Sequence, residues 1–250
     1  MQAGRLVASG LAVLAAVALA AAGLMACQGG GLVRHYEYEE VIDLAVDGSA
    51  TIYVNASVPA AVSLRGMDLD VRPSALLDRT KVRAFFTTPV TRVTRVSRWR
   101  RLGRQYFQVR LAVDDITKLG SAPPFSWAVY RIDRNDGLVV YRQDLAGSAG
   151  KPAGEAGWKS DELVSVRLHL PSRIRYHNAG KDNLKRGNIL VWEQSLADRQ
   201  AGKPLAIEAR FEETSILYSA LVLFALSGTL ALLVLAAIIW WVVRKGKRAA

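Results

Sequence analysis

Alternation of apolar and polar residues predicts a domain built mainly from β-strands. From 36 to 46, Tyr36, Tyr38, Ile42, Leu44 and Val46 fall on one face, and a return strand over 51–58 follows the turn signal Asp47-Gly48. Similar patterns predict strands at 90–98, 105–113, 127–133, 138–144, 163–170, 188–193 and 204–212, and short helices at 59–66, 73–86 and 114–120. Strands that outnumber short helices in this way favour an α+β fold, mainly antiparallel.

The first of two long apolar segments opens the chain. Arg5 precedes an uncharged stretch over 6–24, and Leu24-Met25-Ala26-Cys27 follows it, similar to the lipobox of bacterial lipoproteins. We therefore expect a lipoprotein-type signal peptide over 1–26, a lipidated Cys27 and a tether over 27–34. A conventionally cleaved signal or an uncleaved N-terminal helix are the alternatives.

The second apolar segment lies near the C-terminus, where residues 216–243 carry no charge. A helix of this length spans roughly 42 Å, more than the roughly 30 Å of a bilayer's hydrocarbon core. We expect a transmembrane helix, with a buried core helix as the alternative. Interfacial side chains and a basic tail over 244–250 fit a cytoplasmic end: Trp240, Trp241, Arg244, Lys245, Lys247 and Arg248.

The two apolar segments together place residues 35–215 outside the cytoplasm, as one domain attached to the bacterial cytoplasmic membrane. Its segment 146–157 is rich in Gly, Ala, Ser and Pro and predicts a flexible loop. A boundary between two domains at this loop is the alternative. We favour one domain, because the piece after the loop is short for a hydrophobic core of its own.

Charge adds one local feature to this picture. The chain carries 33 basic and 22 acidic residues, but ten cations and no acid lie between Arg79 and Arg110. The β-branched run over 90–96 predicts a strand, and Gly103 predicts a hairpin tip. Strand geometry then puts Arg92 and Arg98 on one face and Arg95 on the other. The candidate anion-binding residues are Arg92, Arg95, Arg98, Trp99, Arg100, Arg101, Arg104 and Arg110.

Three interpretations of this basic ribbon differ in their partner. Anionic lipid headgroups would gain about 1 kcal/mol per nearby cation. Alternatively, the charges form a salt-bridged, solvated face that protects an edge strand from pairing. Binding of nucleic acid is disfavoured because the export signal places the ribbon outside the cytoplasm.

A resemblance to a known family rests on several loose motifs. Asp47-Gly48-Ser49-Ala50, Leu170-Pro171 with Asn178, and Gly187 with Trp192 combine with the lipobox and the C-terminal basic helix. This layout resembles the LppM-type bacterial envelope lipoproteins or a closely related lipoprotein family. The resemblance implies a β-rich α+β domain in the envelope, linked in its mycobacterial member to envelope glycolipids and to host–cell interaction. It brings no catalytic residues.

Catalytic, metal-binding and cofactor signals are weak. A single cysteine excludes an intrachain disulfide framework, and Ser148 and Lys151 share a catalytic spacing only within the predicted loop. His169 and His177 are expected at the surface, and the acids Glu37, Glu39 and Glu40 are expected to pair with the basic ribbon. We therefore expect a non-enzymatic protein without metal or cofactor. Its domain would bind anionic envelope lipid or glycolipid; alternatively, it is an interaction or assembly module for a membrane protein partner, and an envelope hydrolase is a third class.

Overall fold

The computed structural model describes residues 36–101, 103–146, 158, 161–180, 183–185, 188–214 and 216–249. The expected signal peptide over 1–26, Cys27, the tether over 27–34 and all but the first residue of loop 146–157 lie outside the described residues. The described part is an α+β fold in which two β-sheets enclose one core, which confirms the predicted fold class.

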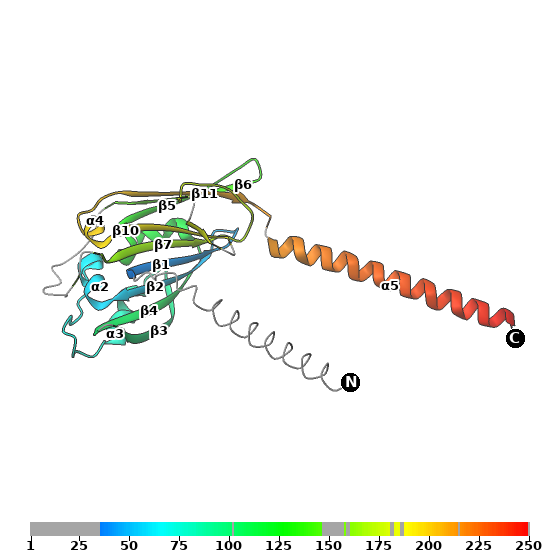
Figure 1. The fold of residues 1–250 in the computed structure, drawn as a ribbon, viewed down its shortest axis with the longest axis horizontal. Helices are drawn as coiled ribbons and strands as arrows, with labels where there is room; N and C mark the ends of the chain where they lie inside the picture. The colour runs from blue at the N-terminus through cyan, green and yellow to red at the C-terminus, as the bar shows by residue number, and fades with distance from the viewer. Residues whose placement is uncertain are drawn as a thin grey trace, which may run out of the picture. The chain divides into compact units, whose positions relative to one another are not determined.

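The larger sheet has seven strands in the order β3-β4-β2-β1-β7-β10-β9 (Figure 1). Most neighbours are antiparallel, as predicted, but β1 and β7 are parallel. This long-range pair inserts the second half of the chain beside its first strand. The strands are β1 Tyr36–Leu44, β2 Ala50–Ser57, β3 Arg92–Arg101, β4 Arg104–Val113, β7 Leu163–His169, β9 Leu184–Lys185 and β10 Ile189–Ser195.

The smaller sheet has four antiparallel strands in the order β5-β6-β11-β8. Strands from both sides of residues 146–157 therefore occur in each sheet: β7 lies between β1 and β10, and β11 lies beside β6. The short strand β8 was not predicted from the sequence. The strands are β5 Ala128–Asn135, β6 Leu138–Leu145, β8 Ile174–His177 and β11 Leu205–Glu212.

Short helices connect the strands, and two of them begin at residues with capping side chains. Ser57 caps α2 (Val58–Arg65), which ends at Gly66 with a φ of 65°. Asp78 caps α3 (Arg79–Phe86), so this helix begins later than the predicted 73 because the cap fixes its first turn. The others are the 3-10 helices η1 Ile116–Ser121 and η2 Pro123–Phe125, and α4 Leu196–Gln200.

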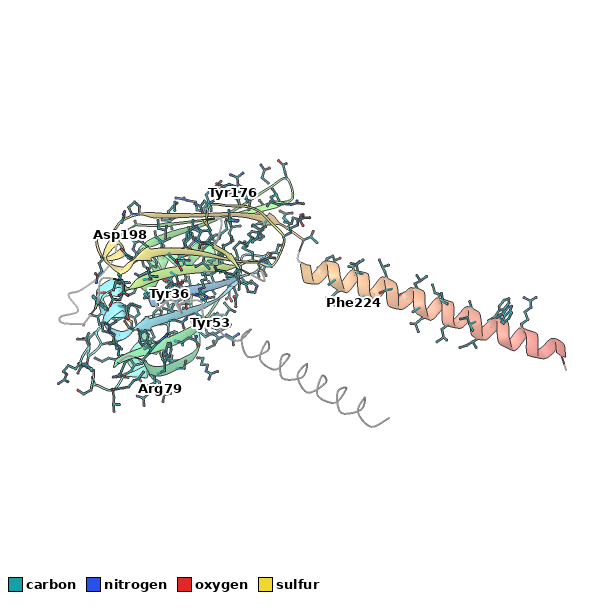
Figure 2. All side chains as sticks on the ribbon, viewed as in Figure 1. Tyr36, Tyr53, Arg79, Tyr176, Asp198 and Phe224 are labelled. Carbon is teal, nitrogen blue, oxygen red and sulfur yellow. The ribbon has the colours of Figure 1, made fainter. Side chains whose placement is uncertain are left out.

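The C-terminal helix α5 runs over Ile216–Ala249. Its segment Ala220–Trp241 is long and apolar enough to cross a membrane, and none of its most apolar window is buried. Phe224, labelled in Figure 2, is 76% exposed. Exposed apolar side chains over this length are what a lipid-facing helix presents, so α5 fits a membrane-associated protein.

Candidate functional site

The basic ribbon forms one edge of the seven-stranded sheet. Among the described residues, β3 pairs with β4 alone, and β4 continues into the sheet through β2. The ribbon is therefore not an isolated hairpin but the border of a large sheet. Of the ten cations between Arg79 and Arg110, all but Arg104 are exposed. Arg79, labelled in Figure 2, extends the charge onto α3, which packs beside this edge.

A β-bulge at Thr94 changes which arginines share a face. Arg92 pairs with Ala112, but the register then shifts, and Arg95 pairs with Arg110. The extra residue reverses the alternation, so Arg92 and Arg95 lie on the same face and Arg98 on the other. The prediction that Arg92 and Arg98 share a face was wrong because a strict two-residue period allows for no bulge.

The outer face of the sheet, which points away from the core, collects cations in pairs along β3 and β4. Arg95 faces Arg110 directly, and Arg101 faces Arg104. Between these pairs Trp99 stacks on Tyr106, with ring centroids 5.6 Å apart. Like charges in directly opposed positions destabilise a sheet, so the Arg95–Arg110 pair lowers the stability of this strand pair.

Arg98 and Arg100 lie on the opposite face of β3, the face that the core-facing side chains share, but both remain exposed. The Nη2 of Arg100 donates to the carbonyl of Pro73 at 2.6 Å. In the same segment, the amide of Leu77 donates to Oε1 of the buried Gln105 at 3.1 Å. These two bonds hold the segment from Pro73 to Leu77 against the β3–β4 hairpin.

Few of these cations are neutralised. Within the described part of the chain, Arg92, Arg95, Arg98 and Arg100 form no ion pair with a carboxylate. Carboxylates elsewhere pair instead with cations outside β3 and β4. These pairs include Asp70–Arg72, Asp144–Arg131, Asp133–Arg142, Glu39–Arg167 and Glu212–Arg175. The salt-bridged alternative therefore does not describe these four arginines.

Arg104 is a ribbon residue with two carboxylate partners. Its guanidinium lies 2.5 Å from Oε1 of Glu37 and 3.5 Å from Oε1 of Glu162. The hydroxyl of Tyr106 donates to the same oxygen of Glu37 at 2.7 Å. Burial, and after it the hydrogen bond to Glu37, raises the pKa of Tyr106 above its usual range. This cluster fixes the tip of the β3–β4 hairpin to β1.

The three acids near the start of β1 have three different partners. Glu37 pairs with Arg104 of the basic ribbon, as predicted. Glu39, which was expected to pair with the ribbon as well, pairs with Arg167 on β7 instead. Glu40 points into the core, where its Oε1 accepts from the hydroxyl of Tyr38 at 2.7 Å and lies 3.5 Å from Nη2 of Arg65. The alternation from Tyr38 to Ile42 places Glu40 on the apolar face, so the sequence did contain this signal.

Arg65 is a buried cation that sequence reasoning missed. Its guanidinium lies 3.6 Å from the ring centroid of Trp127 and 4.2 Å from that of Tyr38. Its Nε donates to the Tyr38 hydroxyl at 3.0 Å. Burial raises the pKa of Glu40, and the opposing effect of Arg65 is smaller. The cluster is enclosed, so it is a structural element rather than a surface site.

The space beside the ribbon is small. A pocket of about 40 Å³ lies between Arg104 and Gln105 on one side and Asp70 to Pro73 on the other. This volume holds a few water molecules and is far too small for an acyl chain. Ligand contact at the ribbon would therefore take place on the surface.

The two histidines that the structure describes, His169 and His177, make local contacts. Nδ1 of His169 lies 3.3 Å from Asp43, and Nδ1 of His177 lies 3.0 Å from the carbonyl of Ala179. Among the described residues, no group of three or more His, Cys, Asp or Glu side chains could hold a metal ion. Ser148 and Lys151 lie outside the described residues.

Comparison with known proteins gives one weak likeness. No family model matches the sequence, and no curated protein matches it. Among solved structures, the chain is similar to the NMR structure of the folded domain of Mycobacterium tuberculosis LppM. The TM-score is 0.41 at 12% identity, covering 76% of this chain and 98% of that one. A likeness at this TM-score and identity shows neither the family nor a function.

Proposed function

We propose that the chain is a non-enzymatic, membrane-anchored protein whose extracytoplasmic domain binds anionic envelope lipid or glycolipid. The binding surface is the cationic edge, defined here as Arg92, Arg95, Arg98, Trp99, Arg100 and Arg101 of β3 with Arg104 and Arg110 of β4. One observation carries the proposal: four exposed arginines of β3 have no carboxylate partner among the described residues, although several carboxylates elsewhere pair with other cations.

The chemistry of the edge suits phosphate or carboxylate headgroups. Every cation of the edge is an arginine, whose planar guanidinium can donate two parallel hydrogen bonds to an anionic group. Each cation held near an anionic surface contributes about 1 kcal/mol. Several exposed arginines on one strand therefore suffice for a salt-sensitive attachment without a deep pocket.

The membrane anchors complete the proposal. The segment Ala220–Trp241 would span the bacterial cytoplasmic membrane, with the basic tail over 244–250 in the cytoplasm and residues 35–215 outside. A diacylglycerol on Cys27 would supply a second anchor. Mass spectrometry of the mature protein tests the second anchor directly, because an unmodified Cys27 thiol contradicts it.

The binding test uses the full chain in neutral detergent micelles titrated with phosphatidylglycerol or phosphatidylcholine, with retained lipid counted by native mass spectrometry. One variant replaces Arg95, Arg98 and Arg100 by Gln. Its matched control replaces Arg131, Arg142 and Arg175, which lie on the smaller sheet and are ion-paired, and changes the net charge equally.

We expect the edge variant to bind phosphatidylglycerol on the order of 10- to 100-fold more weakly, and the control variant to bind it nearly as the parent does. Equal weakening in both variants would mean that net charge alone attracts the lipid. Equal retention of the two lipids by the parent chain would contradict the proposal.

A second candidate function follows from the position of β3 in the sheet. Among the described residues β3 pairs on one side only, so a strand of a membrane protein partner could add to its free side. Crosslinking in membranes followed by pull-down separates the two functions. A stoichiometric protein partner that survives high salt supports strand addition, whereas a salt-sensitive lipid complex supports the first proposal.

A further inference from the structure

The chain enters and leaves the domain at opposite ends of the sheets. Ser57, at the end of β2, pairs with Tyr106, and Ala50, at its start, pairs with Val113. Because β1 and β2 are antiparallel, Tyr36 at the start of β1 lies at the same end as the β3–β4 turn around Gly103. We call this the entry end of the domain.

The exit from the domain lies at the other end, where β1 finishes. The amide of Glu213, directly after β11, donates to the carbonyl of Gly137 at 3.1 Å. Arg134 of the same β5–β6 hairpin donates to the carbonyl of Val46 at 2.7 Å, just after β1. We call this the exit end. Only residues 213–215 join β11 to α5, so a membrane-spanning α5 holds the exit end close to the bilayer.

The cationic edge extends between these two ends. Arg92 lies at the exit end and Arg101 at the entry end of the ten-residue strand β3, which spans roughly 30 Å at about 3.3 Å per residue. A domain standing upright on its exit end would hold Arg98 to Arg101 far beyond the roughly 8 Å over which physiological salt leaves charges unscreened. Half of the edge would then contribute nothing to lipid binding.

Exposed apolar side chains lie at the entry end, where an upright domain would keep them in water. Leu76 is 79% exposed, although its neighbour Leu77 is buried and its segment is fixed to the hairpin through Arg100 and Gln105. Trp99, on β3, is 40% exposed. Leucine and tryptophan beside arginines are typical of protein surfaces that insert into the membrane interface.

We propose that the domain lies on its side, with β3 along the surface of the same bilayer that α5 spans. The arginines of the cationic edge contact anionic headgroups along its whole length, and Leu76 and Trp99 insert into the interface at the entry end. This inference rests on the proposed function and specifies its partner: the anionic bilayer itself. The start of β1 would then also lie near the membrane, which suits a lipid on Cys27.

Hydrogen exchange of the full chain in nanodiscs tests this orientation. The nanodiscs contain either phosphatidylcholine alone or a mixture with phosphatidylglycerol, and exchange is read peptide by peptide. In anionic nanodiscs we expect slower exchange at both ends of β3 and in residues 72–78, by about fivefold or more. An upright domain would instead show protection only at the exit end, around residues 45–49 and 134–138.

Substitution of the apolar anchors sharpens the test. Leu76→Ser with Trp99→Ser should remove the protection of residues 72–78 in anionic nanodiscs. The control pair, Leu184→Ser with Tyr176→Ser, removes side chains that are each 48% exposed and lie away from β3, and should leave the pattern unchanged. Circular dichroism of each variant verifies that the fold is retained.

The outcomes separate this inference from the proposed function. If anionic and neutral nanodiscs give the same exchange throughout the domain, the proposed function fails and the orientation fails with it. If the anionic lipid protects the exit-end half of β3 but not its entry end, or if the Leu76 and Trp99 substitutions have no effect, the orientation is wrong while lipid binding by the edge stands. Protection confined to residues 45–49 and 134–138, with none on β3, would overturn both the orientation and the edge as the binding surface. Protection that appears only when nanodiscs aggregate would indicate contact with a second bilayer and would also overturn the orientation.

Discussion

Arg95 on β3 and Arg110 on β4 occupy directly opposed positions on the same face of the sheet. Two cations so placed repel each other and destabilise the strand pair by a few tenths to about 1 kcal/mol. The ring of Tyr53 lies 5.4 Å from the Arg110 guanidinium and offsets part of this cost. An anion bound between the two guanidinium groups would remove the repulsion, so the pair is better suited to the bound state than to the free one.

Replacement of Arg95 by Glu should separate stability from binding. The new carboxylate would face Arg110, so we expect the free energy of unfolding to rise by about 0.5–1 kcal/mol, while binding of phosphatidylglycerol weakens. Denaturant unfolding in neutral detergent measures the first effect, and native mass spectrometry measures the second.

The matched control is Arg98→Glu, which changes the charge equally but faces Phe107. It should lose lipid binding without gaining stability. If Arg95→Glu is no more stable than Arg98→Glu, the opposed cations do not strain the sheet.

Most strands could be predicted because their local pattern is strong. The turn at Asp47-Gly48 is formed as expected. Between β5 and β6, Asp136 and Gly137 have the positive φ values, 52° and 73°, that hairpin turns of this chemistry favour. Which strands pair with each other was harder to predict from the sequence. The parallel contact between β1 and β7 joins residues more than a hundred positions apart, and no local pattern specifies it.

The candidate site was predictable in composition but not in geometry. The run of arginines and the hairpin at Gly103 were visible in the sequence, whereas the bulge at Thr94 and the edge position of β3 depend on how the strands assemble. The later start of α3 was in principle visible, because Asp78 followed by a helical pattern is a capping signal. The core position of Glu40 was overlooked because a charged residue interrupted an otherwise apolar face.

Loss of Arg65 should be more damaging than loss of Glu40. In Arg65→Met, Glu40 remains buried and loses its ion-pair partner, and we expect a loss of about 3–5 kcal/mol at neutral pH. In Glu40→Gln, Arg65 keeps its contacts with the rings of Trp127 and Tyr38, so the loss should be smaller, about 1–3 kcal/mol. Equilibrium denaturation of the two variants checks this order.

The stability that Arg65→Met loses, measured as the free energy of unfolding relative to the parent chain, should also depend on pH. We call this difference the deficit. Burial raises the pKa of Glu40, and removal of Arg65 takes away the largest effect that opposes burial; the hydrogen bond from Tyr38 and the charge of Arg199 remain. A raised pKa in the folded state means that the folded state binds the proton more readily, so stability rises as pH falls toward the pKa of an unfolded glutamate. The deficit should therefore be smaller at pH 5 than at pH 8. A deficit that is independent of pH would show that Glu40 does not take up a proton; Arg167→Met, at a half-exposed pair with Glu39, is the control.

Buried tyrosines should make the domain sensitive to alkali. Burial is the largest cause that raises the pKa of Tyr38, Tyr106, Tyr130 and Tyr141. The folded state therefore keeps protons that the unfolded chain releases above about pH 10, and stability falls as pH rises beyond that value. Absorbance at 295 nm should show these tyrosines ionising together with unfolding. Smooth ionisation of all eight tyrosines of the chain before unfolding would contradict the expectation.

Glu37 holds Arg104 and Tyr106 to β1, and its replacement by Gln should weaken the fold while strengthening lipid binding. Glu37 is 3% exposed, so loss of its charge-assisted bonds should lower the free energy of unfolding by about 2 kcal/mol. The same change removes one of the two carboxylates that pair with Arg104 and so raises the net positive charge of the edge, and binding of phosphatidylglycerol should increase severalfold. Glu39→Gln removes an equal charge beside Arg167, away from the edge, and should leave lipid binding nearly unchanged. Equal gains in both variants would assign the effect to net charge, and weaker binding in Glu37→Gln would show that Arg104 serves the fold alone.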